Sequence, residues 1–479
     1  MFSINLKNFR SFKKQTFHFD KFNILIGENS SGKSSLFKFL LAAKQTLETP
    51  HNREINFLFS GEFVDLGSYK ESIYYHQDEL PLIFDFVFAE SYIPFFLHFM
   101  LGEDASTKKI KQSLDDYFNE NLPNSISQIS FELTKELNSH DSIKTRISNS
   151  EVGNLYIDPM PIDKKSSKNP LVDNPKCRII YSDIQANKKY VLDNIGYSKD
   201  GFLTIIDPGD LRQSCGKVFT NEDDERKPAT VIKQINRLFN RIALLLVVQN
   251  FVRYNLENIE YINPINTHPS RFYIKKDQKK FSTINNLDDV MAFFSAPDDY
   301  KLKVLKDFIK ILKKLGVTDH VEIMEDERLP VMELRVKVKD LLSNISDVGY
   351  GVSLQIPVIL KALLADRLSD GYKIILIEQP EVHLHPKLHS ALIEVLVSLS
   401  KNTVYFIETH SEHIIRKLQV MVKEKSHELL PNQVTIHYLV RKNKHSEVTE
   451  HPIMETGYLS KSLPTGFFDN SFQLSKQLL

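Results

Sequence analysis

Cysteine is scarce in this sequence, and neither sign of charge is in excess. The 479 residues include two cysteines, Cys177 and Cys215, too few for a disulfide framework and compatible with a reducing cytoplasm. Lysine and arginine total 61, as do aspartate and glutamate, so net charge gives no global case for nucleic-acid binding. We find no signal peptide and no run of about 18 apolar residues that could span a bilayer. We therefore expect a cytoplasmic protein that does not associate with membranes.

The most informative stretch is a glycine-flanked loop near the start of the chain. An apolar, strand-like run, Phe22–Ile26, leads into the loop, and an apolar helix follows it. The spacing fits the phosphate-loop pattern G-x-x-x-x-G-K-[ST]. In such a loop the backbone N–H groups and the lysine face the phosphates, while the serine hydroxyl binds Mg²⁺. The sequence therefore predicts a nucleoside-triphosphate site. Its candidate binding residues are Gly27, Asn29, Ser30, Ser31, Gly32, Lys33, Ser34 and Ser35.

A second apolar strand, Ile374–Ile377, ends in Glu378. Ligands of α/β sheets lie at the carboxyl ends of the strands, so Glu378 is a candidate to hold Mg²⁺ opposite Ser34. A further strand, 403–408, leads to His410, which we expect beside the γ-phosphate. These residues form the second half of the predicted site.

Two histidines, His383 and His385, follow the strand that ends in Glu378. Their i, i+2 spacing could serve a metal ion, but no cysteine or third ligand stands at a useful spacing. We therefore interpret this segment as a structural turn.

Glycines and a serine open another apolar helix at Gly349, Gly351 and Ser353. Such a helix N-terminus is again typical of an anion-binding site. One phosphate group needs only one such cradle, so the second is expected to serve a nucleotide in another subunit. This pattern predicts a homodimer or a higher homo-oligomer.

In this order, the motifs resemble those of RecF/SMC/OLD-like ATPases of the ABC class. They most resemble AAA-family ATPases with a DUF3696-type C-terminus that occur in bacterial defence loci. The resemblance covers about 1–90 and 228–479. The segments that carry it are 8–12, 27–35, 261–265 with Arg271, 349–355, 374–386, 408–411 and 457–469.

The resemblance implies that two heads enclose two ATP molecules with Mg²⁺. The glycine- and serine-containing helix start, 349–353, would contact the γ-phosphate bound by the partner, and His410 would be the switch histidine. Arg10 would touch the nucleotide.

The predicted catalytic residues are Glu378, Gln379, Glu381 and His410. In this superfamily the strand usually ends in Asp-Glu, whereas this chain has Glu378 and Gln379. Glutamine can orient water but cannot accept its proton, so hydrolysis is expected to be slow unless Glu381 substitutes.

The predicted fold class is α/β, an ABC-type ATPase head: a phosphate-loop NTPase whose mixed central sheet is flanked by helices. We assign 1–90 and 229–425 to the two halves of the head, and 426–479 to a DUF3696-like C-terminal segment. Residues 91–228 show no sustained periodicity and are rich in polar residues and turn signals. We interpret them as an inserted α/β or irregular domain.

The resemblance implies a sensor or regulator ATPase in anti-phage defence, acting with a separate effector protein, a nuclease or a toxin. No second active site is visible, because the residues after His410 are too few for the nuclease domain that OLD-type relatives append. One alternative is a RecF-like DNA-repair ATPase that contacts DNA. Another is a scaffold that binds ATP and assembles with little turnover.

Overall fold

The computed structural model describes residues 2–49, 56–89, 126–134, 142–150, 152–160, 175–220, 228–262, 269–275, 284–295, 297–326, 328–338, 340–368 and 371–464. Within them the chain forms two compact units, each built from several segments. Unit 1 comprises Met1–His18, Ser35–Glu257 and Asn443–Ser446, and unit 2 comprises Phe19–Ser34, Asn258–Lys442 and Glu447–Leu479. The predicted domain boundaries at 90, 228 and 425 remain predictions.

Unit 1 is built on one nine-stranded sheet whose neighbouring strands are all antiparallel. Its order is β10-β9-β8-β7-β6-β5-β4-β1-β2. The strands are β1 (Phe2–Phe9), β2 (Phe12–His18), β4 (Leu82–Ala89), β5 (Ile126–Thr134), β6 (Ser142–Asn149), β7 (Gly153–Pro159), β8 (Lys176–Asp183), β9 (Lys188–Asp200) and β10 (Leu203–Ile206).

The described part of residues 91–228 is regular, contrary to the absence of periodicity noted in the sequence. Strands β5 to β10 extend the sheet that β1, β2 and β4 begin. Along β7 and β8 buried and less buried residues alternate, so one face of each strand packs into the core. Residues 91–125 and 161–174 lie outside the described part of the chain.

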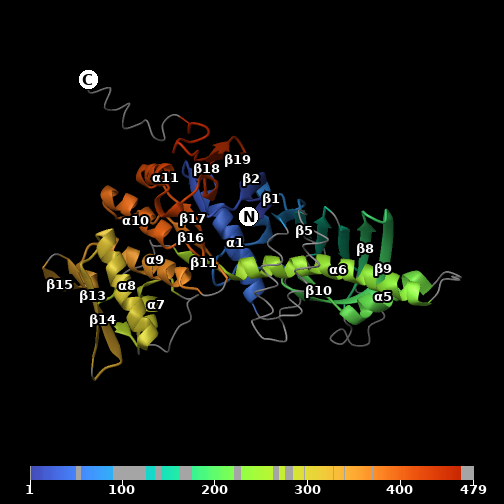
Figure 1. The fold of residues 1–479 in the computed structure, drawn as a ribbon, viewed down its shortest axis with the longest axis horizontal. Helices are drawn as coiled ribbons and strands as arrows, with labels where there is room; N and C mark the ends of the chain where they lie inside the picture. Colours follow the sequence, from blue (N-terminus) through green and yellow to red (C-terminus); the bar gives the residue numbers. More distant parts are fainter. Residues whose placement is uncertain are drawn as a thin grey trace. The chain divides into compact units, whose positions relative to one another are not determined.

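Helix α6 (Pro228–Glu257) lies along the sheet of unit 1, as Figure 1 shows. Apolar residues recur at helical spacing along this segment, which accounts for the helix. The other helices of unit 1 are α1 (Lys33–Glu48), α2 (Tyr69–Ser72), η1 (Tyr74–His76) and α5 (Pro208–Thr220). Helix α1 begins in unit 2, because its first two residues belong to the phosphate loop.

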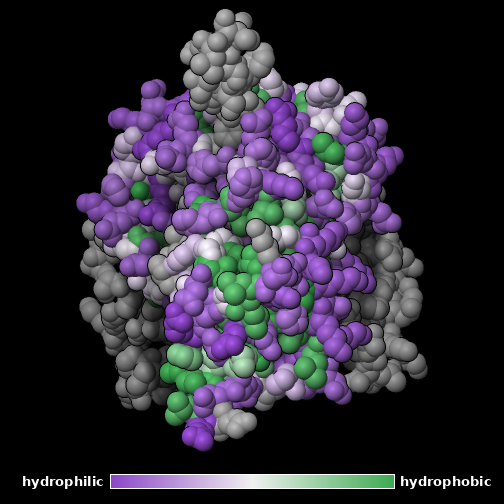
Figure 2. Space-filling model, turned by 90° about the vertical axis from the view of Figure 1, so that its left-hand side faces the viewer, coloured by the Kyte–Doolittle hydropathy of each residue, from purple (hydrophilic) through white to green (hydrophobic). Residues whose placement is uncertain are grey.

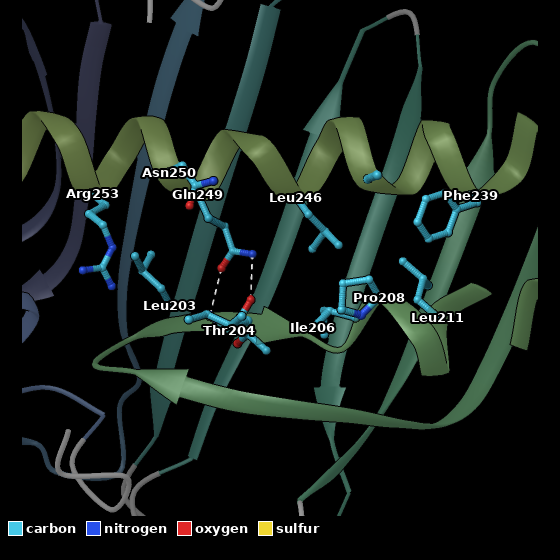
Figure 3. Close-up of a pocket in the computed structure, with 12 residues that line it drawn as sticks. Leu203, Thr204, Ile206, Pro208, Leu211, Phe239, Leu246, Gln249, Asn250 and Arg253 are labelled. Carbon is cyan, nitrogen blue, oxygen red and sulfur yellow. Dashed lines mark hydrogen bonds between the residues drawn. The ribbon is translucent and has the colours of Figure 1, made fainter. Parts of the chain in front are cut away.

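A pocket of about 260 Å³ lies between α6 and the edge strand β10 (Figure 3). The Gln249 amide bridges it, donating to the carbonyl of Thr204 at 3.0 Å and accepting from its N–H at 2.9 Å. In this way the amide takes the place of a neighbouring strand at one position of the sheet edge. The lining is mainly apolar, and none of the predicted nucleotide-binding residues belongs to it.

Unit 2 contains a six-stranded sheet of order β11-β16-β17-β3-β18-β19. Its first five strands pair in parallel. The strands are β3 (Phe22–Gly27), β11 (Ile259–Ile262), β16 (Lys373–Glu378), β17 (Thr403–Glu408), β18 (Val434–Lys442) and β19 (His445–Pro452). Strand β3 is buried along its whole length. The strand that enters the phosphate loop is therefore central in the sheet, with β17 on one side and β18 on the other.

A smaller sheet of β12 (Tyr273–Ile274), β13 (His320–Glu325), β14 (Val331–Val338) and β15 (Leu341–Asn344) completes unit 2. It packs one face into the core and leaves apolar side chains exposed, among them Ile274, Met324 and Leu341. Figure 2 shows hydrophobic side chains gathered between polar ones on this side of the molecule. The helices of the unit are α7 (Leu287–Phe294), α8 (Asp299–Leu315), η4 (Ile345–Asp347), α9 (Tyr350–Asp366), α10 (Pro386–Ser398), α11 (Glu412–Glu424), η5 (Ser426–Glu428) and η6 (Pro431–Gln433).

Among the described helices none is both long enough and apolar enough to cross a membrane.

Candidate functional site

The loop between β3 and α1 has the tight backbone that its glycines predict. Gly27 has φ +146°, and a Cβ at this position would lie 2.1 Å from the carbonyl oxygen of Leu439 on the neighbouring strand β18. Gly32 and Ser30 also have positive φ, 96° and 61°. A side chain at position 27 therefore cannot fit, and the loop can curl only because glycine stands there.

The buried side chain of Lys33 is hydrogen-bonded to the backbone of this loop. It is 5% exposed, and its Nζ donates to the carbonyls of Gly27, at 3.1 Å, and Glu28, at 2.8 Å. Burial lowers the pKa of Lys33, and the carboxylate of Glu408 opposes this effect. The hydroxyl of Ser31 is buried and has no hydrogen-bond partner in the described structure. An ammonium group beside an unsatisfied hydroxyl fits a phosphate group, whose oxygens accept hydrogen bonds.

The hydroxyl of Ser34 donates to Oε2 of Glu408 at 2.9 Å. Glu408 was not among the site residues predicted from the sequence, which were Glu378 at the end of one strand and His410 after the other. The sequence does place an acid at the end of β17, and β17 is the strand that pairs with β3. Ser34, Glu408 and Glu378 supply hydroxyl and carboxylate oxygens, the ligand type that Mg²⁺ prefers.

Glu378 and Gln379 end β16, one strand further from the phosphate loop. Glu378 stands opposite Glu408 in the register of β16 and β17. The N–H of Gln379 donates to the carbonyl of Glu408 at 2.7 Å, and Gln379 has a left-handed backbone with φ 43°. The sharp turn after β16 is thus fastened to the end of β17.

Glu381 and His410 also join these two strand ends. Oε1 of Glu381 accepts from the N–H of His410 at 2.8 Å. Its Oε2 is buried and has no partner in the described structure, which leaves one carboxylate oxygen for a water molecule or ligand. His410 is exposed to solvent, and neighbouring atoms surround part of its imidazole ring. Partial burial and the charge of Lys33 lower the pKa of His410, whereas Glu381 raises it.

The glycine- and serine-containing start of α9 contacts this same turn. Gln355 donates from Nε2 to the carbonyl of Pro380 at 2.8 Å. Gly351 approaches so closely that an added Cβ would lie 2.6 Å from the carbonyl oxygen of His383.

Gly349 is the exposed N-cap of α9. Ser353 is fully buried, and its hydroxyl donates to the carbonyl of Tyr350 at 2.8 Å. Of the three predicted residues, Gly349 is the one that faces solvent.

We expect Gly351→Ala to destabilise the protein by about 1–3 kcal/mol, because the new Cβ overlaps a backbone oxygen that cannot rotate away. Gly349→Ala is the matched control. A Cβ there meets nothing within 4 Å, so its effect should stay within about 0.5 kcal/mol. Urea denaturation of both variants measures the difference. Equal stability of the two would contradict the close approach of α9 to the turn.

Arg10 belongs to unit 1, where its N–H donates to the carbonyl of Ser72 and burial lowers its side-chain pKa. Its contact with nucleotide remains a prediction. Residues 263–268 and 465–479, which hold part of the resemblance, lie outside the described chain.

The histidines after β16 form a turn, as the sequence predicted. His383 is exposed and its ring lies 5.6 Å from that of Tyr350, and His385 is the N-cap of α10. His389 bridges the two strand ends, with Nδ1 2.8 Å from the hydroxyl of Ser411 and Nε2 3.1 Å from the carbonyl of Leu384. The residues that the structure describes contain no group of three or more histidine, cysteine or acidic side chains suited to a metal ion.

Comparison with known proteins adds the following. A family model described as an AAA ATPase domain matches residues 1–415. A protein from Vibrio cholerae serotype O1 biovar El Tor, named retron Vc95 probable ATPase, is 25% identical over 166 residues, covering 33% of this chain and 31% of that protein. The chain therefore matches less than a third of that relative's length.

Among solved structures, an SMC head bound to the C-winged helix domain of ScpA is 11% identical with a TM-score of 0.39, covering 94% of this chain and 98% of that one. The SMC head domain from Thermotoga maritima is 11% identical with a TM-score of 0.34 and the same coverage, 94% and 98%.

Proposed function

Because this chain belongs to the AAA ATPase domain family, whose model spans residues 1–415, we propose that it binds ATP with Mg²⁺ at the loop of Gly27 to Ser35 and hydrolyses it. The observation that carries the proposal is the convergence of Lys33, Ser34, Glu408, Glu381 and His410 at one edge of the parallel sheet. The family model and the sheet order agree with the ABC-type ATPase head predicted from the sequence.

In this proposal Lys33 transfers its hydrogen bonds from the loop carbonyls to the β- and γ-phosphates, and Ser31 donates to a phosphate oxygen. Ser34 and the acids that end β16 and β17 would hold Mg²⁺, which would neutralise charge on the phosphates. Glu381 holds the attacking water with its second carboxylate oxygen. His410 lies beside the γ-phosphate.

We further propose that two chains associate around ATP, with the start of α9 facing the nucleotide of the partner. Gly349 and the N-terminus of α9 supply exposed backbone N–H groups for this contact. The retron relative supports a role in anti-phage defence, as a regulator of a separate effector protein.

The expected result of the first experiment is slow phosphate release by wild-type protein with MgATP, reduced at least about 100-fold by Glu381→Gln. The substitution keeps the shape of the side chain but removes its ability to accept a proton. Gln379→Glu, which introduces a carboxylate at the neighbouring position, should raise the rate. Phosphate release and ATP binding are measured on the same samples.

A second candidate is a scaffold that binds ATP and assembles without turnover. Gln379 favours it, because an amide cannot serve as a general base. Light scattering with and without ATP separates the two functions. Assembly with ATP and no phosphate release, in wild type and Glu381→Gln alike, would establish the scaffold and refute the hydrolase.

A further inference from the structure

We propose that Glu408 is the carboxylate that orients Ser34 for Mg²⁺, so that the metal side of the site is built on β17 as well as β16. The inference rests on the proposed binding of MgATP. It assigns a positioning role to a residue outside the Glu378–Gln379 pair.

The hydrogen bond between the two residues has the direction that such a role requires. Ser34 has one hydroxyl proton and donates it to Oε2 of Glu408 at 2.9 Å. Both lone pairs of the Ser34 oxygen then remain for a cation. A ligand held by an outer carboxylate in this manner keeps its orientation and gains basicity.

The topology of the sheet explains why Glu408 reaches Ser34. Strand β17 pairs with β3, and Glu408 stands opposite Leu25 in that register. Strand β16 pairs with the other side of β17. Two strand spacings, about 10 Å, separate the backbones of β16 and β3. Of the two acids that end β16 and β17, Glu408 is therefore the one on the strand next to β3.

The surroundings of Glu408 also fit a cation. The residue is 4% exposed, and a buried carboxylate is costly unless charges or hydrogen bonds compensate it. The ammonium group of Lys33 contributes part of that compensation, since the charge of Glu408 acts on Lys33. With nucleotide bound and Lys33 donating to the phosphates, a Mg²⁺ ion held by Ser34 would supply positive charge near this carboxylate.

The test uses the full chain and a fluorescent ATP analogue, whose affinity is measured with Mg²⁺ and with EDTA. Wild type should bind more tightly with Mg²⁺. Glu408→Gln should reduce this gain about 10- to 100-fold without lowering the affinity in EDTA. Ser34→Ala should have the same effect, and the double variant should lose no more than either single one, because Glu408 acts through Ser34.

Glu394→Gln is the matched control, an identical change on helix α10 at an acid paired with Lys314 and Lys417. It should bind as wild type does. Full Mg²⁺ dependence in Glu408→Gln, with its loss in Glu378→Gln, would overturn the inference, as would an equal loss in EDTA. Should Glu408→Gln fail to fold, unchanged Mg²⁺ dependence in Ser34→Ala would also overturn it. Wild type that binds no analogue at all would refute the proposed function itself.

Discussion

Replacing Lys33 with alanine is expected to lower the affinity for MgATP at least about 100-fold. The change removes a buried ammonium group that holds two loop carbonyls, at 3.1 and 2.8 Å, and that would face the phosphates. A hydrogen bond from a charged donor contributes about 1.5–3 kcal/mol, so the loss of two such bonds to the phosphates would account for this factor. Fluorescence titration with an ATP analogue measures it.

Lys38→Ala is the control for this prediction, because Lys38 lies five residues further along the same helix, α1. Its affinity should equal that of wild type. If Lys33→Ala binds the nucleotide as tightly as Lys38→Ala does, the nucleotide does not occupy this loop.

Replacing Lys361 with methionine should lower the free energy of unfolding by about 3 kcal/mol. Its side chain is fully buried, and Nζ lies 3.1 Å from Oε2 of Glu260 and 2.9 Å from Oδ1 of Asn285. Without this cation, Lys373 is the one cation among the described residues that still pairs with the equally buried carboxylate of Glu260, with Nζ 3.5 Å from Oε1. An isolated charge in a core costs more than a pair does. Urea denaturation measures the change.

Two further variants test the cause. Lys373→Met should cost less than Lys361→Met, because Lys373 is partly exposed and more distant from the carboxylate. The double variant Lys361→Met, Glu260→Leu should recover much of the stability, since it removes both charges. A double variant less stable than Lys361→Met alone would show that the stability is lost with the ion pair itself, and not through the unpaired carboxylate of Glu260. The result bears on the site, because this pair joins α9 to β11 beside the strand that ends in Glu378.

Features that depend on local spacing were predictable from the sequence. The phosphate loop follows from eight consecutive positions, and α6 follows from its apolar period. The strands of residues 126–206 were missed, because their outer faces carry lysine, aspartate and serine, and because β8 and β9 shift register between Cys177 and Ile179. A short alternation with such interruptions does not stand out from a polar loop.

The contacts that complete the candidate site depend on pairing between distant segments. Ser34 and Glu408 are 374 residues apart, and only the register of β17 with β3 brings them together. Ser353 is buried, and its hydroxyl donates to the carbonyl of Tyr350 within α9, so the phosphate contact that the motif suggested stays a prediction.

The hydrogen bonds of Lys33 have a consequence for the thermodynamics of nucleotide binding. Because its ammonium group already holds the carbonyls of Gly27 and Glu28, the loop keeps its curled shape without a ligand, and binding need not supply the entropy of ordering it. The same bonds make the protein's own backbone a competitor of the phosphates for one positive charge. The free energy of binding then contains the difference between the bonds that Lys33 forms to the phosphates and the bonds that it gives up to the two carbonyls. The affinity therefore falls when the ligand offers fewer phosphate oxygens.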